Sequence, residues 1–252
     1  MDPQTLLLAL VVAAAAALQA ATGIGFGVIA GPVLLMVLDS GAAIQISILL
    51  SLLIAGVLTP ALWPQVEQGV LKGLLAGGVL GLPLGVGVFL WMELAWLKLL
   101  AALAVAFTLG FVLRGGRAAR PAAGHPGPGG WQALGIGVCS GVMGGSLAMP
   151  GPLPAAWMTA RHFSPAAVRA TILALFVFSY LAALLLQMAW AGAGGQELWQ
   201  HAWLGAPTLA GVGLGRLLVR RMTARRFRGI LIVILAATVL SLLANALPAL
   251  TG

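Results

Sequence analysis

Long apolar segments with almost no charge run through this sequence, and they limit its fold more than any other feature. Only 18 of the 252 residues are charged, 13 basic and 5 acidic, while 61% are hydrophobic. A soluble domain carries roughly a quarter of its residues as charged side chains, so this chain cannot cover a globule with a polar surface. The composition excludes a soluble enzyme and a disordered chain. It predicts a polytopic membrane protein whose apolar residues face the lipid bilayer.

Six segments have the length of about 20 residues that a membrane-spanning helix needs. They are Ala42–Leu62, Gly69–Leu90, Ala95–Leu113, Ala166–Trp190, Ala202–Leu218 and Phe227–Leu247. Two further apolar stretches, Thr5–Leu38 and Trp131–Ala160, are too long for one helix and too short for two crossings. Each contains glycines followed by a proline, residues that interrupt helices. We therefore expect each stretch to be broken in its middle.

The two halves of the chain resemble each other in the order of their motifs. Gly23–Pro32 aligns with Gly141–Pro150 at an offset of 118 residues (23 to 141), and later matches follow at offsets of 124 (45 to 169) and 130 (81 to 211). We expect an all-α fold of two homologous repeats, residues 1–113 and 131–252, joined by a polar Gly/Pro/Arg linker over 114–130. Each repeat would hold a broken or re-entrant first segment and three transmembrane helices. Duplicated halves that open with a broken helix are typical of transporters whose site lies between the repeats.

Two arrangements of the broken segments fit these lengths. If both segments cross the membrane, the 13 Lys and Arg residues divide 4 to 9 between the two sides. If both are re-entrant hairpins, Lys98 alone is separated from the other 12, and the halves become inverted repeats. The hairpin arrangement agrees better with the excess of Lys and Arg in cytoplasmic loops. Against it, the matching residues Lys98 and Arg228 would lie on opposite faces.

A helix broken inside a membrane leaves backbone N–H groups that need a polar partner. A new helix beginning near Gly27 would direct its first N–H groups and its positive dipole end at a break over Thr22–Gly27. We expect the same at Ser140–Ser146, and helix N-termini bind anions. The competing interpretation is that these glycines only allow close helix packing. The candidate substrate-binding residues in the breaks are Thr22, Gly23, Gly25, Gly27, Ser140, Gly141, Gly144, Gly145 and Ser146.

Four further candidates lie near the start of the spans that follow the broken segments. Gln45 and Arg169 hold equivalent repeat positions, and each is followed two residues later by a hydroxyl, Ser47 or Thr171. A charge inside a span is costly and indicates a functional role, and a planar guanidinium suits an oxyanion. The alternative for Arg169 is that it extends its charged end to the interface and anchors the helix.

No pattern in the sequence predicts catalysis or metal binding. Gly137–Gly141 has the outline of a nucleophile elbow, but no base can be assigned to Ser140. The histidines lack metal-ligand spacing, and the single Cys139 forms no cluster. We therefore expect no enzyme, no cofactor and no metal site. Nucleic acid is not an expected partner either, because the basic residues lie in short connectors between apolar segments.

The motifs Gly23–Pro32, Ala43–Ser47 and Gly81–Gly85, together with their second-half copies, resemble the TauE/SafE sulfite exporter family. This family is also called the toluene sulfonate uptake permease family, and the resemblance covers nearly the whole chain. Its members are membrane proteins of bacteria, archaea and plants that are implicated in moving sulfite, organosulfonates and related sulfur anions or carboxylates. One departure is Phe26, which separates Gly25 from Gly27 where the family has adjacent glycines.

The resemblance implies a secondary transporter, an exporter of sulfite or organosulfonates in the bacterial inner membrane, with a proton or sodium ion as coupling ion. We expect helix N-termini at the two breaks to hold the anion near the midplane of the bilayer. The sequence leaves three alternatives open: a passive anion channel, a carboxylate transporter and a non-transporting membrane scaffold.

Overall fold

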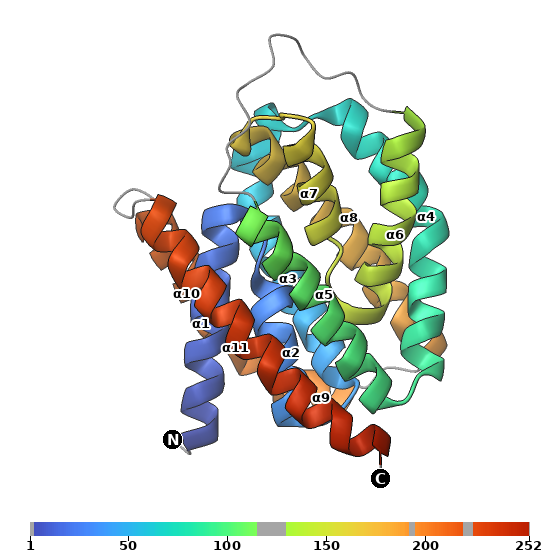
Figure 1. Cartoon of the computed structure of the whole chain (residues 1–252), viewed down its shortest axis with the longest axis vertical. Coiled ribbons are helices and arrows are strands. Elements are labelled where there is room, and N and C mark those ends of the chain that lie inside the picture. The colour runs from blue at the N-terminus through green and yellow to red at the C-terminus, as the bar shows by residue number, and fades with distance from the viewer. Residues whose placement is uncertain (1–2, 115–129, 192–194, 219–223, 252) are drawn as a thin grey trace.

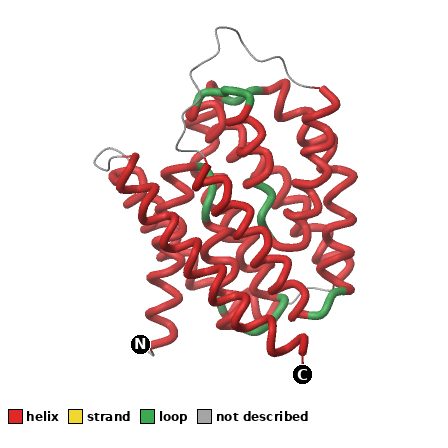
Figure 2. The backbone as a smooth tube through the Cα atoms, viewed as in Figure 1, coloured by secondary structure: helices red, strands yellow, loops and turns green. Residues whose placement is uncertain are grey.

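The computed structural model describes residues 3–114, 130–191, 195–218 and 224–251, and all regular structure in these ranges is helical (Figures 1 and 2). The helices of the first half are α1 (Pro3–Thr22), α2 (Phe26–Leu38), α3 (Ala42–Leu62), η1 (Trp63–Gln65), α4 (Gln68–Trp91) and α5 (Leu94–Arg114). Those of the second half are α6 (Gly130–Leu147), α7 (Pro152–Ala160), α8 (Pro165–Ala191), α9 (Gly195–Gln200), η2 (Ala202–Leu204), α10 (Gly205–Leu218) and α11 (Ala224–Thr251).

All six predicted spans are helical, so the all-α fold is confirmed, and four of them, α3, α4, α5 and α8, have the length and apolar character of a membrane-spanning helix. α3 has the predicted bounds, and the other spans differ at their ends, most clearly where Ala202–Leu204 forms the short turn η2 ahead of α10. Five helices of the described chain are long and apolar enough to cross a membrane. They are Gln4–Thr22, Ala42–Gln65, Gln68–Trp91, Leu94–Leu113 and Pro165–Trp190. The predicted linker falls almost entirely on residues 115–129, outside the described part of the chain.

The first broken segment is interrupted where the glycines predict it. α1 ends at Thr22 and α2 begins at Phe26, which leaves a short non-helical stretch inside the molecule (Figure 2). Gly23 and Gly25 have φ angles of 82° and 141°, which L side chains rarely adopt. Gly23 still donates its N–H to the carbonyl of Gln19 at 2.7 Å, which closes the last turn of α1.

The second broken segment is interrupted further along the chain than predicted. Ser140–Ser146 lies within α6, which continues to Leu147, so the expected break at these residues is wrong. The interruption is at 148–151, where Ala148 adopts a left-handed conformation (φ 58°) and the Met149 N–H bonds the Met143 carbonyl at 3.1 Å. Pro150 ends the helix there because its ring cannot continue the hydrogen-bond ladder. The preceding glycines allow helix packing instead of breaking the helix.

Both broken segments return to the end of the molecule at which they start. The Arg161 guanidinium, just after α7, donates to the Gln132 side chain at the start of α6 at 2.8 Å. α1 rises from the lower end in Figure 1, and Asp39 after α2 pairs there with Lys98 at the start of α5. Each segment therefore folds back on itself in the structure, which is the geometry of the hairpin arrangement.

Helices from different halves pack in corresponding pairs. α4 packs along α6 and α10 packs along α1, while α3 lies on α8 and α5 on α11. Glycines allow the first two pairs to approach closely. A Cβ added at Gly81 of α4 would lie 2.0 Å from the Val138 carbonyl oxygen of α6, and one at Gly211 of α10 would lie 2.2 Å from the Ala13 carbonyl oxygen of α1.

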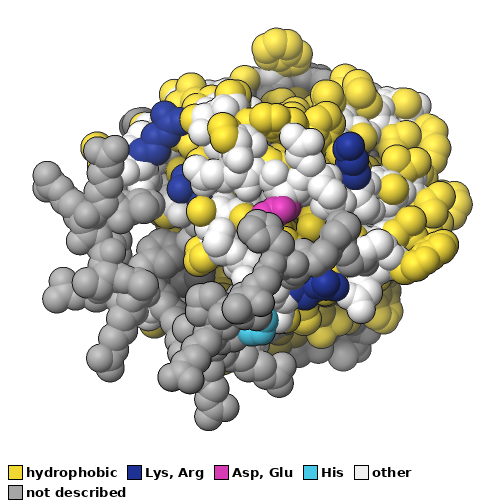
Figure 3. All heavy atoms as spheres, turned by 90° about the horizontal axis from the view of Figure 1, so that it is seen from above, with side chains coloured by type: hydrophobic (Ala, Val, Ile, Leu, Met, Phe, Trp, Pro, Cys, Tyr) yellow, Lys and Arg dark blue, Asp and Glu magenta, His cyan; other side chains and the backbone are white. Residues whose placement is uncertain are grey.

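The described basic side chains divide unevenly between the two ends of the molecule. Lys72, Arg161, Arg169 and Arg216 belong to the upper ends of their helices, where Figure 3 shows Lys and Arg side chains among apolar ones. Lys98 belongs to the lower end. Arg117, Arg120, Arg220 and Arg221 lie outside the described residues.

Candidate functional site

The two interruptions meet each other in the interior of the molecule. A Cβ added at Gly27 of α2 would lie 2.2 Å from the carbonyl oxygen of Ala148, so the two backbones touch directly. Met149 fills the next position along α2, its Cε 3.8 Å from where a Cβ of Gly31 would be. The buried Tyr180 of α8 donates its hydroxyl proton to the Ala148 carbonyl at 2.8 Å.

The N-terminus of α2 supplies backbone donors at this junction. Gln19, completely buried on α1, accepts a hydrogen bond from the Phe26 N–H through its Oε1 at 3.2 Å. This bond fixes the orientation of the amide, and the Gln19 Nε2 donor has no partner among the described residues. The backbone N–H groups of Gly27 and Val28 come next in the first turn of α2. They also have no hydrogen-bond acceptor among the described residues. The positive end of the α2 dipole lies at the same place.

One face of α3 adds two buried hydroxyls. Ser47 is fully buried, its Oγ has no hydrogen-bond partner among the described residues, and it lies 3.6 Å from where a Cβ of Gly31 would be. Ser51, one turn further along, lies beside the Tyr180 hydroxyl. We call Gln19, Gly27, Ser47 and Ser51 the donor cluster. Gln45 is also buried, but it lies on a different face of α3, because residues two apart in a helix do not face each other.

Arg169 binds protein rather than facing an open site. Its guanidinium Nη2 donates to the Ala20 carbonyl at the end of α1, and its Cγ is the atom that a Cβ at Gly23 would meet, at 2.9 Å. The buried Nε has no partner in the described chain, and Arg216 is close enough to act on it electrostatically. Helix α8 also caps α6, since Gln187 donates through Nε2 to the Gly145 carbonyl at 2.8 Å. One helix thus satisfies a carbonyl at both interruptions.

The remaining predicted polar residues are engaged with the backbone in this conformation. Thr22 bonds to the Leu18 carbonyl at 2.8 Å, Ser140 donates to the Pro150 carbonyl at 2.5 Å, and Ser146 donates to the Val142 carbonyl at 2.7 Å. Thr171 accepts the Glu67 N–H at 3.0 Å and ties α8 to the turn before α4. These hydroxyls shape the interruptions rather than offering free donors.

The predicted glycines face other parts of the protein. Their Cβ directions point at Arg169 for Gly23, Leu18 for Gly25, α4 backbone for Gly141 and Gly145, and Pro150 for Gly144. Close packing, the competing interpretation in the sequence, therefore describes what these positions do in this conformation. The second helix N-terminus is also poorer in donors than expected, because Pro152 and Pro154 at the start of α7 have no N–H.

Sequence reasoning did not find Gln19, Ser51 and Tyr180. Each has a detectable signal, because an amide, a hydroxyl or a phenol inside an apolar span needs a partner. Gln19 is the one strongly polar side chain between Thr5 and Thr22, and Tyr180 is the single tyrosine of the chain. The abundant glycines of the sequence predict backbone N–H groups as ligands instead of these side chains.

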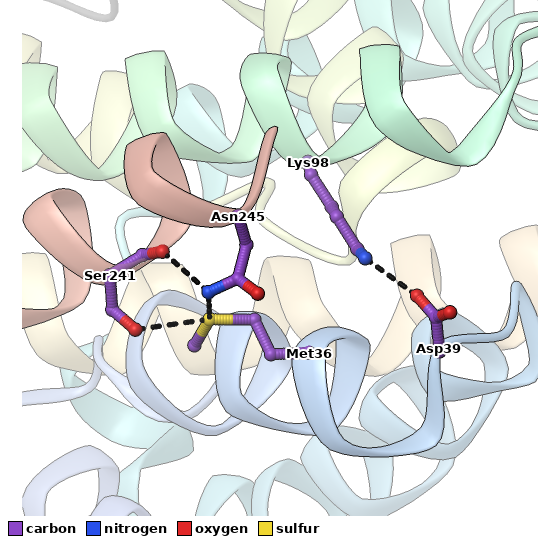
Figure 4. Close-up of polar contacts among 5 residues, drawn as sticks. All are labelled: Met36, Asp39, Lys98, Ser241 and Asn245. Atoms are coloured by element: carbon purple, nitrogen blue, oxygen red, sulfur yellow. Dashed lines mark hydrogen bonds and ion pairs between the residues drawn. The ribbon is translucent and has the colours of Figure 1, made fainter. Parts of the chain in front are cut away.

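At the lower end, α2 is held by polar contacts to two other helices (Figure 4). Lys98 Nζ lies 2.6 Å from Asp39 Oδ1, with side-chain exposures of 12% and 70%. Ser241 and Asn245 of α11 donate to the Met36 sulfur at 3.2 and 3.6 Å. Asp39 follows the C-terminus of α2, where a carboxylate is unfavourable, so the nearly buried ammonium of Lys98 offsets that charge.

The geometry defines a class of protein. No group of His, Cys, Asp and Glu in the described residues is arranged to hold a metal ion. Multi-pass apolar helices with two broken segments that meet in the interior of the molecule are typical of membrane transporters.

The amino-acid sequence identifies the family. Residues 8–242 match the family model described as Sulfite exporter TauE/SafE, and the chain belongs to that family. The resemblance in the motifs is thereby confirmed. No curated protein and no solved structure matches the chain.

Proposed function

We propose that this protein is a secondary transporter that exports a small sulfur oxyanion, sulfite or an organosulfonate, across the bacterial inner membrane. The donor cluster at the N-terminus of α2 would hold the anion. The observation that carries the proposal is a set of buried groups that can donate hydrogen bonds and have no partner there among the described residues. Gln19 Nε2 and Ser47 Oγ have no partner among the described residues, beside the free N–H groups that begin α2.

Unpartnered donors of this kind are expensive in a protein without a ligand. Each buried donor left unsatisfied costs about 1–3 kcal/mol, and water is scarce at this depth in a bilayer. An oxyanion presents several acceptor oxygens and no need for a counter-charge when a helix N-terminus and neutral donors surround it. A cation would find the reverse of what it needs, because the donor cluster contains no carboxylate.

Alternating access would come from rocking of two inverted repeats, and the packing supports that duplication. Val138 and Ala13, the contacts of Gly81 and Gly211, are 125 residues apart (13 to 138). The left-handed residues after α1 and α6, Gly23 and Ala148, have the same offset (23 to 148). With Gly23 and Ala148 as equivalent positions, the first segments would correspond at an offset of 125 residues (23 to 148), whereas the motif alignment uses 118 (23 to 141).

Arg169 supports entry of the anion from the cytoplasmic end. It lies near the upper end of α8 with one buried guanidinium nitrogen unpaired. Release of the Ala20 carbonyl would free a second nitrogen for an oxyanion. A proton or sodium gradient is the proposed coupling force.

The proposal is tested by sulfite uptake into proteoliposomes and by sulfite binding to the purified protein. Ser47→Ala removes a hydroxyl that has no hydrogen-bond partner in the described part of the chain, so the stability of this variant without sulfite should equal or exceed that of the wild type. A hydrogen bond to a charged ligand is worth about 1.5–3 kcal/mol, so its kcat/KM should fall roughly 10- to 100-fold. Gln19→Glu keeps the acceptor for the Phe26 N–H while replacing the donor, so its kcat/KM should fall as well, although the buried carboxyl group lowers its stability.

The matched control is Thr208→Val, which removes a buried hydroxyl of α10 that donates to the Leu204 carbonyl in the preceding turn η2. Unchanged transport in Ser47→Ala and Gln19→Glu would refute the assignment of the site. Flux that fails to saturate would favour a passive channel, preference for carboxylates over sulfite would favour a carboxylate transporter, and no flux of any anion would favour a scaffold.

A further inference from the structure

A second feature of the molecule is an apolar cavity of about 530 Å³ that the proposed anion path does not use. It lies between α4, α5, α6 and α7, and the side chains around it include Met92, Ala104, Phe107, Met143, Ser146 and Leu153. Ser146 is the one polar side chain among the residues that line it, and its hydroxyl is already bonded to the Val142 carbonyl. The cavity has the size of a small-molecule site.

Neither water nor the proposed oxyanion fits this lining. A buried water needs two to four polar partners, and the lining offers one hydroxyl that is already bonded to a carbonyl. An oxyanion would lose its hydration and find no donor. The apolar side chains that line the cavity are suited to a hydrocarbon ligand.

The cavity is continuous with the lipid-facing surface of the protein. Phe107, on its wall, is 46% exposed, and Leu103 and Leu84 on the same helices are exposed apolar residues as well. α5 packs mainly along α11 and makes few contacts with α6 and α7. The cavity therefore opens between α5 and the second hairpin, which is formed by α6 and α7. The bilayer is therefore the immediate source of a ligand.

We propose that an acyl chain of a membrane phospholipid occupies this cavity as a bound ligand. Leu147 and Leu153, on its wall, flank the interruption at 148–151, so the chain would lie against the second re-entrant hairpin. Inside a bilayer the acyl chain gains nothing from leaving water, so shape complementarity and packing against the walls select it.

The experiment uses the full-length protein, purified and stripped of lipid in detergent, with phosphatidylglycerol as the probe. Native mass spectrometry measures retained phospholipid, and thermal unfolding measures the Tm as phosphatidylglycerol is added. Ala104→Phe and Leu153→Phe fill the cavity from two sides. Leu84→Phe is the matched control, because Leu84 is 62% exposed on α4 and is not part of the lining.

We expect the wild type and Leu84→Phe to retain phospholipid and to show a Tm that rises with the logarithm of the phosphatidylglycerol concentration. Both filling variants should unfold cooperatively, lose the retained lipid and lose that rise. Equal lipid retention in either folded filling variant, or none in the wild type, would overturn the proposal. So would a wild-type dimer that the filling variants convert to a monomer, since a second copy would then occupy the cavity.

Discussion

Gly27 and Ala148 are in direct backbone contact, with the Cα of the first packed against the carbonyl oxygen of the second. The two residues are 121 positions apart (27 to 148) and belong to the two re-entrant hairpins. Tyr180 bonds the same carbonyl, so α8 is fixed to the junction as well. The interruptions of the two halves are therefore parts of one central structure, and a movement of either hairpin changes this contact.

Gly27→Ala should destabilise the protein. The added Cβ would lie 2.2 Å from the Ala148 oxygen, and overpacking of this kind costs about 1–3 kcal/mol. Thermal unfolding in detergent measures the loss. Gly56→Ala is the control, because a Cβ there meets nothing within 4 Å and alanine is a better helix former than glycine. Equal Tm values for the two variants would show that the contact is absent.

Tyr180→Phe should lower the free energy of unfolding by about 1–3 kcal/mol, because the buried Ala148 carbonyl loses its hydroxyl donor. The aromatic ring stays in place beside Phe176 at a centroid distance of 5.0 Å, so packing is conserved. Chemical denaturation of the purified variant measures the change. An unchanged midpoint would mean that water or another group satisfies the carbonyl.

Gly81→Ala and Gly211→Ala should have similar effects, since each would place a Cβ 2.0–2.2 Å from a carbonyl oxygen of the partner helix. We expect losses of several degrees in Tm for both. Gly213→Ala, on the same helix as Gly211 with open space at its Cβ, should be neutral or stabilising. A large loss for one glycine and none for the other would argue against equivalent packing of the two halves.

The uneven distribution of basic residues predicts an orientation. In a Cys139→Ser background, a cysteine at the exposed position of His162 should react with a membrane-impermeant maleimide only from the cytoplasmic side. A cysteine at exposed Glu93, at the opposite end, should react only from outside. The reverse labelling pattern would contradict the orientation, and labelling of both from one side would contradict the hairpin topology.

Asp39→Asn should change stability only slightly, by about 0–1 kcal/mol, because the carboxylate is 70% exposed and water screens the ion pair. The difference between variant and wild type should shrink as salt is raised. Lys98→Met should be better tolerated in the Asp39→Asn background than alone, since it then leaves no unpaired carboxylate at the end of α2. A Tm comparison of the four proteins at low and high salt measures both effects.

The sequence predicts the helices well, because scarce charge and apolar length leave few other solutions. It also predicts the first interruption, since Gly23 and Gly25 lie in conformations that favour glycine. The second was misplaced because glycines in an apolar helix have two uses. Gly141 and Gly145 pack against α4, whereas Ala148 and Pro150 carry the actual turn.

The candidate site was predicted less completely than the fold. Ser47 lies in the donor cluster as a buried free hydroxyl, whereas the hydroxyls of Ser140 and Ser146 bond backbone. Which hydroxyls are free depends on tertiary contacts between segments far apart in sequence. The local sequence pattern does not contain that information. Gln19 is the clearest example, because it belongs to α1 but accepts the Phe26 N–H at the start of α2.

The most direct test of the central claim is a density map of the protein in lipid nanodiscs with saturating sulfite. The account predicts density for one anion at the first turn of α2, within hydrogen-bond distance of the Gly27 N–H, Gln19 Nε2 and Ser47 Oγ. Sulfite bound elsewhere, with these donors still unpaired, would contradict it.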